Sequence, residues 1–304
     1  MTENHLIVER NARTDKLASE LTDMVIAALI DEATLTPKPG LVDMRSPGAH
    51  EDMSWSLMCD SALALRPTFC AMAEAGMQQY PARRLREIIG ALGRAGEVRM
   101  MEVTNGVNTH RGAIWALGLL ITAAAQNAST SNVGVITQRA AQLAQIDDQY
   151  APKFTDNKGE QACFKYQVGG AKAQAQAGFP LVVEYALPVL HHSRQQGAKE
   201  SCAKLNALLS IMAVLDDTCI LSRGGIKALH AVQSGARQVL ELGGMKTSLG
   251  NAALNSLEAE MLRQRLSPGG SADMLAATLF LDNLMKKSAS RRPDSNYQFQ
   301  TNAR

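Results

Sequence analysis

The feature that most constrains this chain is a succession of long stretches in which apolar residues recur every three to four positions. This spacing places the apolar side chains on one face of an α-helix, as in the run of Leu17, Leu21, Met24, Val25 and Ala28. The stretches are rich in Ala, Leu, Met, Gln, Glu and Arg, which favour helices. Aromatic residues make up only 4% of the chain, and no stretch alternates apolar and polar residues as a strand does. The sequence therefore predicts an all-α protein.

Prolines and glycines divide these stretches into separate predicted helices. The first, over 15–33, ends at the Thr36–Gly40 run, where two prolines and a glycine prevent continuation. A second begins near Ser54, with Pro67 ending or kinking it, and a third has Pro81 in its first turn. The other predicted helices span roughly 111–127, 135–147, 180–194, 200–215, 225–242, 249–265 and 271–287.

These helices are expected to form a single multi-helix globular domain over residues 15–287. The chain has 304 residues, of which 46% are hydrophobic, and this is enough to bury a full core. Residues 1–14 are polar and are predicted to be flexible, and the tail over 288–304 has the polar composition of a disordered segment. The nearly apolar run from Gly112 to Ala125 is short for a membrane span and fits a buried core helix.

Charge and cysteine content argue against several classes of protein. The net charge is only +2, with scattered lysines and arginines, so no nucleic-acid partner is expected. The first residues lack an apolar leader, and no membrane partner is expected. The five cysteines form no C-x-x-C pair, which indicates a reducing, cytoplasmic setting without a zinc site or disulfide framework. Neither a P-loop nor a Rossmann glycine motif is present.

Glycines and charged side chains gather at four junctions between predicted helices, and function is expected there. The junctions are 36–43 with 48–53, 106–112, 216–218 with 222–225, and 266–273. Glycine lets the backbone approach a ligand closely, and the N-terminus of a following helix offers free N–H groups to phosphate. The candidate phosphate-binding residues are Lys38, Gly40, Asn108, Thr109, Arg111, Arg223, Gly224, Gly225, Gly269, Gly270 and Ser271.

Carboxylates and histidines at the same junctions are candidates for metal binding and proton transfer. Mg²⁺ takes carboxylates together with substrate phosphates. The candidate metal ligands are Asp43, Asp52, Asp217 and Asp273, and the candidate catalytic residues are Asp43, His50, Asp52, His110 and Asp217. We expect Asp43, His50, His110, Asp217 and Asp273 to line one cleft.

Each of these features also has a structural explanation. The Thr36–Gly40 run can be a helix stop, Asn108 or Thr109 a helix cap, and Ser267-Pro268 an ordinary helix start. A histidine in such a place is often hydrogen-bonded and structural. Residue types and spacing alone leave these alternatives open.

The four junctions together, in this order, resemble the triphosphoribosyl-dephospho-coenzyme A synthase family, which makes a prosthetic-group precursor for citrate lyase and malonate decarboxylase. The matching motifs are P-K-P-G-L-V-D at 37–43, G-A-H-x-D-M at 48–53, G-V-N-T-H-[KR]-G at 106–112, D-T at 217–218 with R-G-G at 223–225, and S-P-G-G-S-A-D at 267–273. Glu97 and Met100 match an E-x-x-M pattern before the second junction. The resemblance covers about residues 17–285.

The resemblance implies an all-α enzyme that transfers the triphosphoribosyl group of ATP to the 2′-hydroxyl of 3′-dephospho-coenzyme A. Adenine leaves, and the product is 2′-(5″-triphosphoribosyl)-3′-dephospho-coenzyme A. Mg²⁺ is implied as a clamp on the triphosphate. The implied indirect partners are a downstream holo-carrier transferase and an acyl carrier protein subunit. Whether that subunit belongs to citrate lyase or to malonate decarboxylase stays open.

The sequence departs from the family pattern in two places. Where the family has G-x-[RK]-G-E-A, this chain has Ala173 for the glycine and Gln174 for the glutamate, and Cys219 replaces an asparagine after D-T. Glutamine cannot act as an anion or a base. The departures leave open a divergent paralogue that binds nucleotide with little transfer. A Mg²⁺-dependent helical hydrolase that cleaves an N-glycosidic bond with water is a separate alternative.

Overall fold

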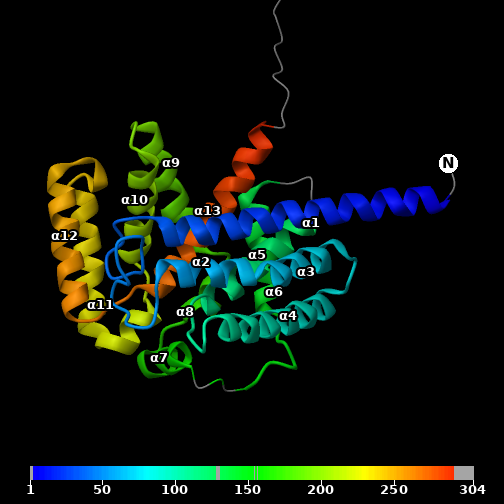
Figure 1. The fold of residues 1–304 in the computed structure, drawn as a ribbon, viewed down its shortest axis with the longest axis horizontal. Coiled ribbons are helices and arrows are strands. Elements are labelled where there is room, and N and C mark those ends of the chain that lie inside the picture. Colours follow the sequence, from blue (N-terminus) through cyan, green and yellow to red (C-terminus); the bar gives the residue numbers. More distant parts are fainter. Residues whose placement is uncertain (1–2, 128–130, 154, 156, 291–304) are drawn as a thin grey trace, which may run out of the picture.

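The structure is a computed structural model that describes residues 3–127, 131–153, 155 and 157–290. Over these residues it consists of helices and their connections, without a β-strand (Figure 1), and the predicted all-α fold is confirmed. In chain order the helices are α1 (Glu3–Thr34), α2 (Trp55–Ala64), α3 (Arg66–Met77), α4 (Ala82–Val103), α5 (Arg111–Ala125), α6 (Val133–Gln145), α7 (Lys158–Tyr166), α8 (Gly170–Gln176), the π-helix η1 (Leu181–Ala186), α9 (Leu187–Gln195), α10 (Glu200–Met212), α11 (Thr218–Glu241), the 3₁₀-helix η2 (Gly244–Lys246), α12 (Ser248–Arg263) and α13 (Gly269–Ser290).

The apolar helix α5 lies at the centre of the core, as its sequence predicts. It packs against α3, α4, α6 and α13, and α1 also contacts it. Its side chains Leu117, Leu120 and Ile121 are fully buried. None of the helices in the described part of the chain has the length and apolar character needed to cross a membrane.

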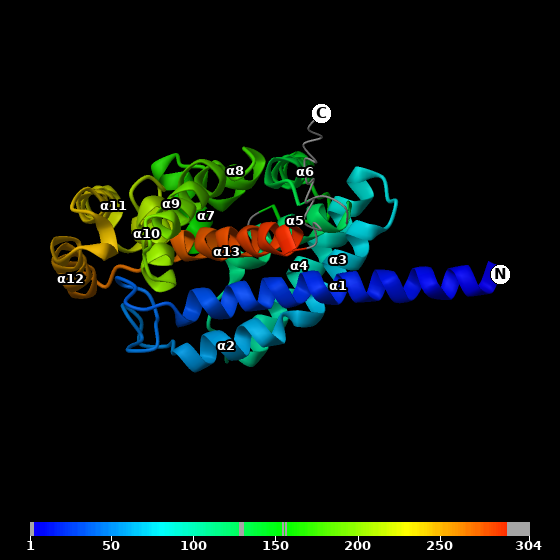
Figure 2. The same ribbon diagram turned by 90° about the horizontal axis from the view of Figure 1, so that it is seen from above.

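Helix α1 is longer than its predicted range of 15–33. It begins at Glu3, because residues 3–14 contain no proline or glycine that would stop a helix. Residues predicted to be flexible thus form its first turns, which extend away from the other helices (Figures 1 and 2). Of the predicted tail, residues 288–290 belong to α13, and 291–304 lie outside the described residues.

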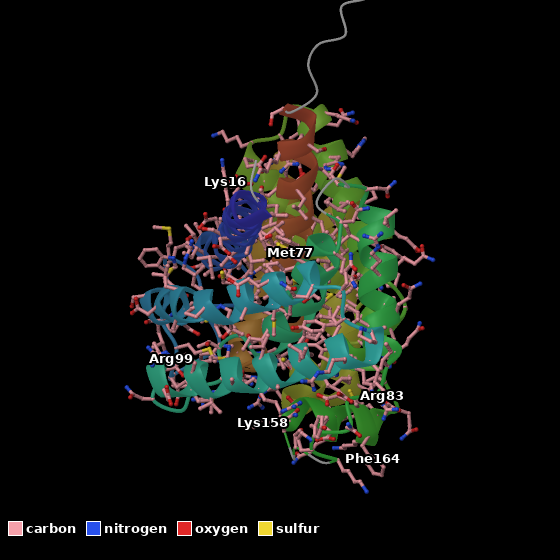
Figure 3. The ribbon with its side chains drawn as sticks, turned by 90° about the vertical axis from the view of Figure 1, so that its right-hand side faces the viewer. Lys16, Met77, Arg83, Arg99, Lys158 and Phe164 are labelled. Carbon is pink, nitrogen blue, oxygen red and sulfur yellow. The ribbon has the colours of Figure 1, made fainter. Side chains whose placement is uncertain are left out.

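Two short helices differ from the prediction, whereas the predicted break at Pro67 is confirmed. Helix α2 ends at Ala64, and Pro67 lies in the first turn of α3, where its missing N–H is harmless. The short helices α7 and α8 were not predicted, because neither is long enough to show an apolar repeat. Figure 3 shows Lys158 and Phe164 of α7 at the opposite side of the molecule from Lys16 of α1. The side chain of Phe164 is 82% exposed.

The connection over 35–54 joins the end of α1 to α2, which packs against α1. It is irregular and lies beside α11 and α12 in both ribbon views (Figures 1 and 2). Helix α11 is interrupted at Gly225, whose φ of 69° and ψ of −168° are not helical. The four predicted junctions are therefore all found at helix ends or breaks on this side of the fold.

Candidate active site

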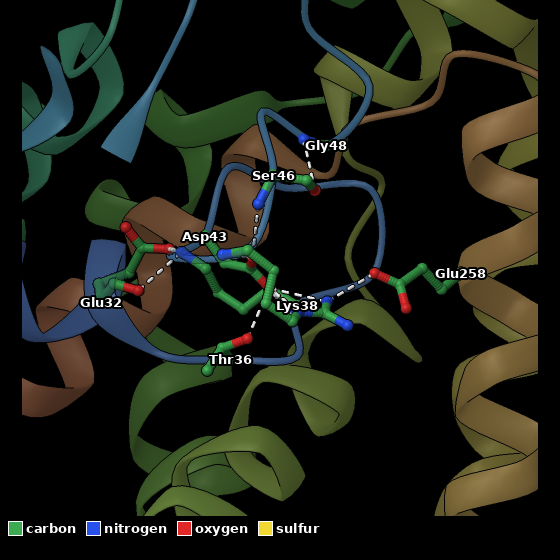
Figure 4. Close-up of polar contacts among 8 residues, drawn as sticks. Glu32, Thr36, Lys38, Asp43, Ser46, Gly48 and Glu258 are labelled. Carbon is green, nitrogen blue, oxygen red and sulfur yellow. Dashed lines mark hydrogen bonds and ion pairs between the residues drawn. The ribbon is translucent and has the colours of Figure 1, made fainter. Parts of the chain in front are cut away.

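Asp43 organises the irregular connection after α1. Its carboxylate accepts a hydrogen bond from Thr36 Oγ1 at 2.9 Å and another from the Lys38 backbone N–H at 3.1 Å. The Arg45 guanidinium lies 2.8 Å from the same carboxylate and 2.7 Å from Glu258 of α12 (Figure 4). Burial alone would raise the pKa of Asp43, but these donors hold it below its usual value. Because its oxygens already accept hydrogen bonds from the protein, Asp43 is poorly suited to the predicted catalytic or metal-binding role.

Lys38 is buried and paired rather than presented to a ligand. It is 2% exposed, and its Nζ lies 2.6 Å from Oε1 of Glu32 (Figure 4). Nζ also donates to the backbone oxygen of Glu32 at 2.6 Å. Removing either member of such a pair leaves a buried charge uncompensated. This arrangement argues for a structural role of Lys38 and against the predicted phosphate contact.

Asp217 joins the N-termini of α11 and α13. It is the N-cap of α11 and accepts a hydrogen bond from the Cys219 N–H at 2.9 Å. From α13 it accepts bonds from the Ser271 N–H at 2.8 Å, the Ser271 hydroxyl at 3.0 Å and the Gly270 N–H at 3.3 Å. Burial raises the pKa of Asp217, although these donors favour the anion. The helix N-termini that were expected to bind phosphate therefore already hold a carboxylate of the protein.

The second junction is held by the E-x-x-M pattern that precedes it. Nε of Arg111 donates to Glu97 at 2.9 Å, and Asn108, two residues before the N-cap His110, accepts from the Arg111 N–H at 3.2 Å. The Met100 sulfur accepts from the His110 N–H at 3.2 Å. The motif residues before α5 thus fix the start of this helix, and Arg111 has a carboxylate partner in this structure.

His110 is buried at the start of α5 with one ring nitrogen unsatisfied. Its Nδ1 lies 3.0 Å from Oγ of Ser61, which also lies 2.6 Å from Thr109 Oγ1. Its Nε2 has no hydrogen-bond partner among the described residues. Burial, followed by the charge of Lys38, lowers the pKa of His110 to about 4, so the ring is neutral at pH 7. An unpaired buried nitrogen is costly, which makes Nε2 a candidate contact for a substrate.

Asp273 connects the fourth junction with the second. Its carboxylate accepts a hydrogen bond from the Ala113 N–H in the first turn of α5. A Cβ atom at Gly112 would lie 2.0 Å from its Oδ2, so only glycine leaves room for it. Burial, and then the charges of Glu32 and Asp217, raise the pKa of Asp273 well above its usual value.

A cleft of about 470 Å³ lies beside these contacts, between the first junction and the ends of α11 and α12. This volume is within the range of small-molecule sites. The cleft is lined by Gly48, Ala49, His50, Glu51, Asp52, Arg223, Leu262 and Arg265.

His50 and Arg223 form one wall of the cleft. Nε2 of His50 lies 2.8 Å from the Ser267 hydroxyl, and its Nδ1 lies 3.4 Å from Nη2 of Arg223. A guanidinium can only donate, so Nδ1 is the acceptor and Nε2 carries the proton shared with Ser267. Burial, and then Arg223, lower the pKa of His50, while Asp52 at 3.8 Å opposes them. Nη1 of Arg223 is anchored by the backbone oxygens of Ala49 and Arg265 at 3.2 and 3.0 Å.

The four junctions meet, but their predicted residues do not all line one cleft. His50, Asp52 and Arg223 border it. The expectation is wrong for Asp43, His110, Asp217 and Asp273, none of which lines the cleft; the first three are at most 3% exposed. The glycines of the motifs pack closely instead. Added Cβ atoms at Gly224, Gly269 and Gly270 would lie 2.4 Å from Ala228 Cβ, 2.9 Å from Cys219 Sγ and 3.2 Å from Asp217 Oδ2, and Gly225 breaks α11.

The predicted metal ligands are not gathered around one point. Within the described ranges no three His, Cys, Asp or Glu side chains are placed to hold a metal ion. Asp43 and Asp217 face protein donors, whereas the side chain of Asp52 is 63% exposed at the cleft. One carboxylate is enough for Mg²⁺ when substrate phosphates and water supply the other ligands. Asp52 therefore fits the ion best, and Mg²⁺ binding stays a prediction.

Sequence reasoning missed several residues that build this region. Glu32 and Ser61 lie inside helices and carry no local signal of their partners Lys38 and His110. Arg265 directly precedes the fourth junction at 266–273, and this position was the signal that could have indicated it.

Comparison with known proteins agrees with the motifs. The model of a family described as ATP:dephospho-CoA triphosphoribosyl transferase matches residues 18–292. A Stutzerimonas stutzeri protein named probable 2-(5″-triphosphoribosyl)-3′-dephosphocoenzyme-A synthase is 53% identical over 268 residues, which are 88% of this chain and 92% of that protein. A Klebsiella pneumoniae protein named 2-(5″-triphosphoribosyl)-3′-dephosphocoenzyme-A synthase is 52% identical over 266 residues, 88% of this chain and 95% of its own. No solved structure matches the chain significantly. The chain therefore belongs to the ATP:dephospho-CoA triphosphoribosyl transferase family.

Proposed function

We propose that this protein transfers the triphosphoribosyl group of ATP to the 2′-hydroxyl of 3′-dephospho-coenzyme A and releases adenine. Family membership supports the reaction. The structural observation that supports its location is the cleft where His50, Asp52 and Arg223 meet, since these side chains come from two motifs far apart in the sequence. The product would serve a downstream transferase that modifies an acyl carrier protein subunit.

The reaction breaks the C1′–N9 bond of ATP and forms a bond from C1′ to the acceptor oxygen. The acceptor hydroxyl gives its proton to a base, and adenine gains a proton on a ring nitrogen as it leaves. Positive charge develops on the ribose, and a nearby carboxylate stabilises it. Asp52 is the motif carboxylate that lines the cleft and is a candidate for this role, and neutral His50 could accept the proton only at Nδ1, which faces Arg223.

The triphosphate must be held without being cleaved. Arg223 is fixed by two backbone oxygens and can donate its remaining N–H groups to phosphate. Mg²⁺, when bound, would neutralise phosphate charge, and Asp52 would hold it together with the phosphates.

The test is to incubate the protein with ATP and Mg²⁺, with and without dephospho-coenzyme A, and to follow adenine by chromatography and the product by mass spectrometry. We expect adenine release only when the acceptor is present. Release without the acceptor would indicate a hydrolase, and nucleotide binding without release would indicate the non-transferring paralogue. Arg223→Ala should lower turnover about a hundredfold, whereas Arg263→Ala, which removes an exposed arginine paired with Glu260, should not.

A further inference from the structure

The cleft contains a second arginine that belongs to none of the motifs. Arg265 lines it together with Arg223, and its Nη2 lies 2.9 Å from Oε1 of Glu51. The two side chains are 75% and 80% exposed, so water and salt screen the pair and it exchanges easily. Arg265 is therefore charged, accessible and only loosely held.

The backbone of Arg265 has a conformation that is unfavourable for a residue with a side chain, so the presence of an arginine there needs an explanation. Its φ is 54°, in the left-handed region, and its N–H bonds to Leu262 while the next N–H bonds to Met261. This is the usual end of a helix, at a position where glycine is favoured because a Cβ is unfavourable there. The exposed ion pair with Glu51 contributes little stability, so it does not explain an arginine at such a position.

The same backbone segment fixes Arg223. The carbonyl oxygen of Arg265 accepts from Nη1 of Arg223 at 3.0 Å, so the two arginines are placed by one turn of chain. Two guanidinium groups on one cleft suit a chain of linked phosphates, which carries several charges and many acceptor oxygens.

We propose that Arg265 is a second phosphate-binding arginine, which exchanges the Glu51 carboxylate for the polyphosphate chain of a substrate. Glu51 occupies the guanidinium until substrate arrives. The inference rests on the proposed function, because both substrates of that reaction carry linked phosphates: the triphosphate of ATP and the diphosphate of dephospho-coenzyme A.

The direct test is calorimetric titration of the full-length protein with inorganic tripolyphosphate. Arg265→Ala should weaken binding about tenfold, as expected for the loss of a charge-assisted contact. Glu51→Gln should strengthen it, because the competing carboxylate is gone. The matched control is Arg263→Ala, whose arginine pairs with Glu260 outside the cleft and should bind like the wild type. Arg265→Gly, which suits the left-handed backbone, guards against misfolding of the alanine variant.

The opposite effects of the two changes distinguish a phosphate site from a structural ion pair. If the pair only holds the loop, Arg265→Ala and Glu51→Gln should weaken binding alike, and the proposal is then refuted. The proposal is equally refuted if neither Arg265→Ala nor Arg265→Gly changes the affinity for tripolyphosphate.

Steady-state kinetics then identify the source of the phosphates. A KM raised about tenfold for ATP alone, with kcat little changed, assigns Arg265 to the triphosphate, and the same effect for dephospho-coenzyme A assigns it to the diphosphate. The titration needs no turnover. A wild-type protein that binds tripolyphosphate through Arg265 but releases no adenine would contradict the proposed function and leave the phosphate site standing.

Discussion

Gly40 lies directly against the backbone of Leu266. A Cβ atom at Gly40 would lie 2.3 Å from the Leu266 carbonyl oxygen, and Gly40 has a φ of 70°. The first and fourth junctions can therefore approach each other only because residue 40 has no side chain. This contact places the chain that carries His50 next to the chain that carries Ser267, its hydrogen-bond partner.

Gly40→Ala should therefore both destabilise the protein and disrupt the cleft. We expect a loss of about 3 kcal/mol in the free energy of unfolding, since a clash with rigid backbone adds to the strain of a positive φ. Gly106→Ala is the matched control, because Gly106 has a φ of 86° but no atom within 4 Å of its added Cβ. It should cost only about 1 kcal/mol. Urea unfolding measures the stability of both variants. Equal losses in the free energy of unfolding would show that the contact between Gly40 and Leu266 does not matter for stability.

The neutral ring of His110 should make the protein less stable in mild acid. Its pKa is about 4 when folded, below the ordinary 6.5, so the unfolded chain binds the proton more tightly. The stabilisation is present above pH 6.5 and is lost as the pH falls toward 4. From pH 7 to pH 5 the loss should be about 2 kcal/mol.

Urea unfolding of the wild type and His110→Gln at several pH values tests this prediction. The glutamine variant should lack the part of the pH dependence that His110 causes, whatever its stability at pH 7. His230→Gln is a suitable control, because His230 is exposed on α11. An unchanged slope in His110→Gln would show that His110 titrates normally.

The long helices could be predicted because each carries its own pattern of apolar residues, as α5 and α13 show. The meeting of the four junctions followed from their resemblance to one family. The resemblance did not predict which groups pair with each charged side chain. Asp217 receives its bonds from Ser271, 54 positions away, and nothing near Asp217 in the sequence indicates that partner. In the sequence, Lys38 resembles a phosphate-binding lysine, but in the fold it pairs with Glu32. Local sequence specifies helices well, whereas the partner of a charge depends on tertiary contacts.

Asp217→Asn should disturb the fold as well as the reaction. Each carboxylate oxygen accepts from two donors, so either orientation of an asparagine amide turns its NH₂ group toward N–H or O–H groups. An unpaired buried donor costs about 1–3 kcal/mol. We expect the melting temperature to fall by several degrees and turnover to fall with it.

Asp216→Asn is the control for that change, because Asp216 is the exposed neighbour of Asp217. It should keep the wild-type melting temperature in a calorimetric scan. A stable Asp217→Asn with normal turnover would remove Asp217 from both roles.

Gln174 should reveal whether the family's glutamate acts as an anion. Its Oε1 is buried without a hydrogen-bond partner among the described residues, and it lies on α8, which begins at Gly170 beside Thr218 of the third junction. An unpaired buried oxygen can accept a hydrogen bond or bind a cation, and a carboxylate would bind a cation more strongly than an amide. We expect Gln174→Glu to raise the rate of adenine release and to steepen its dependence on Mg²⁺. The measurement is the steady-state rate of both forms over a series of Mg²⁺ concentrations, with Gln142→Glu as the control, since Gln142 is exposed on α6. If Gln174→Glu and the wild type have equal rates at every Mg²⁺ concentration, residue 174 only shapes the turn before Phe179. The Phe179 N–H donates to the backbone oxygen of Gln174 in that turn.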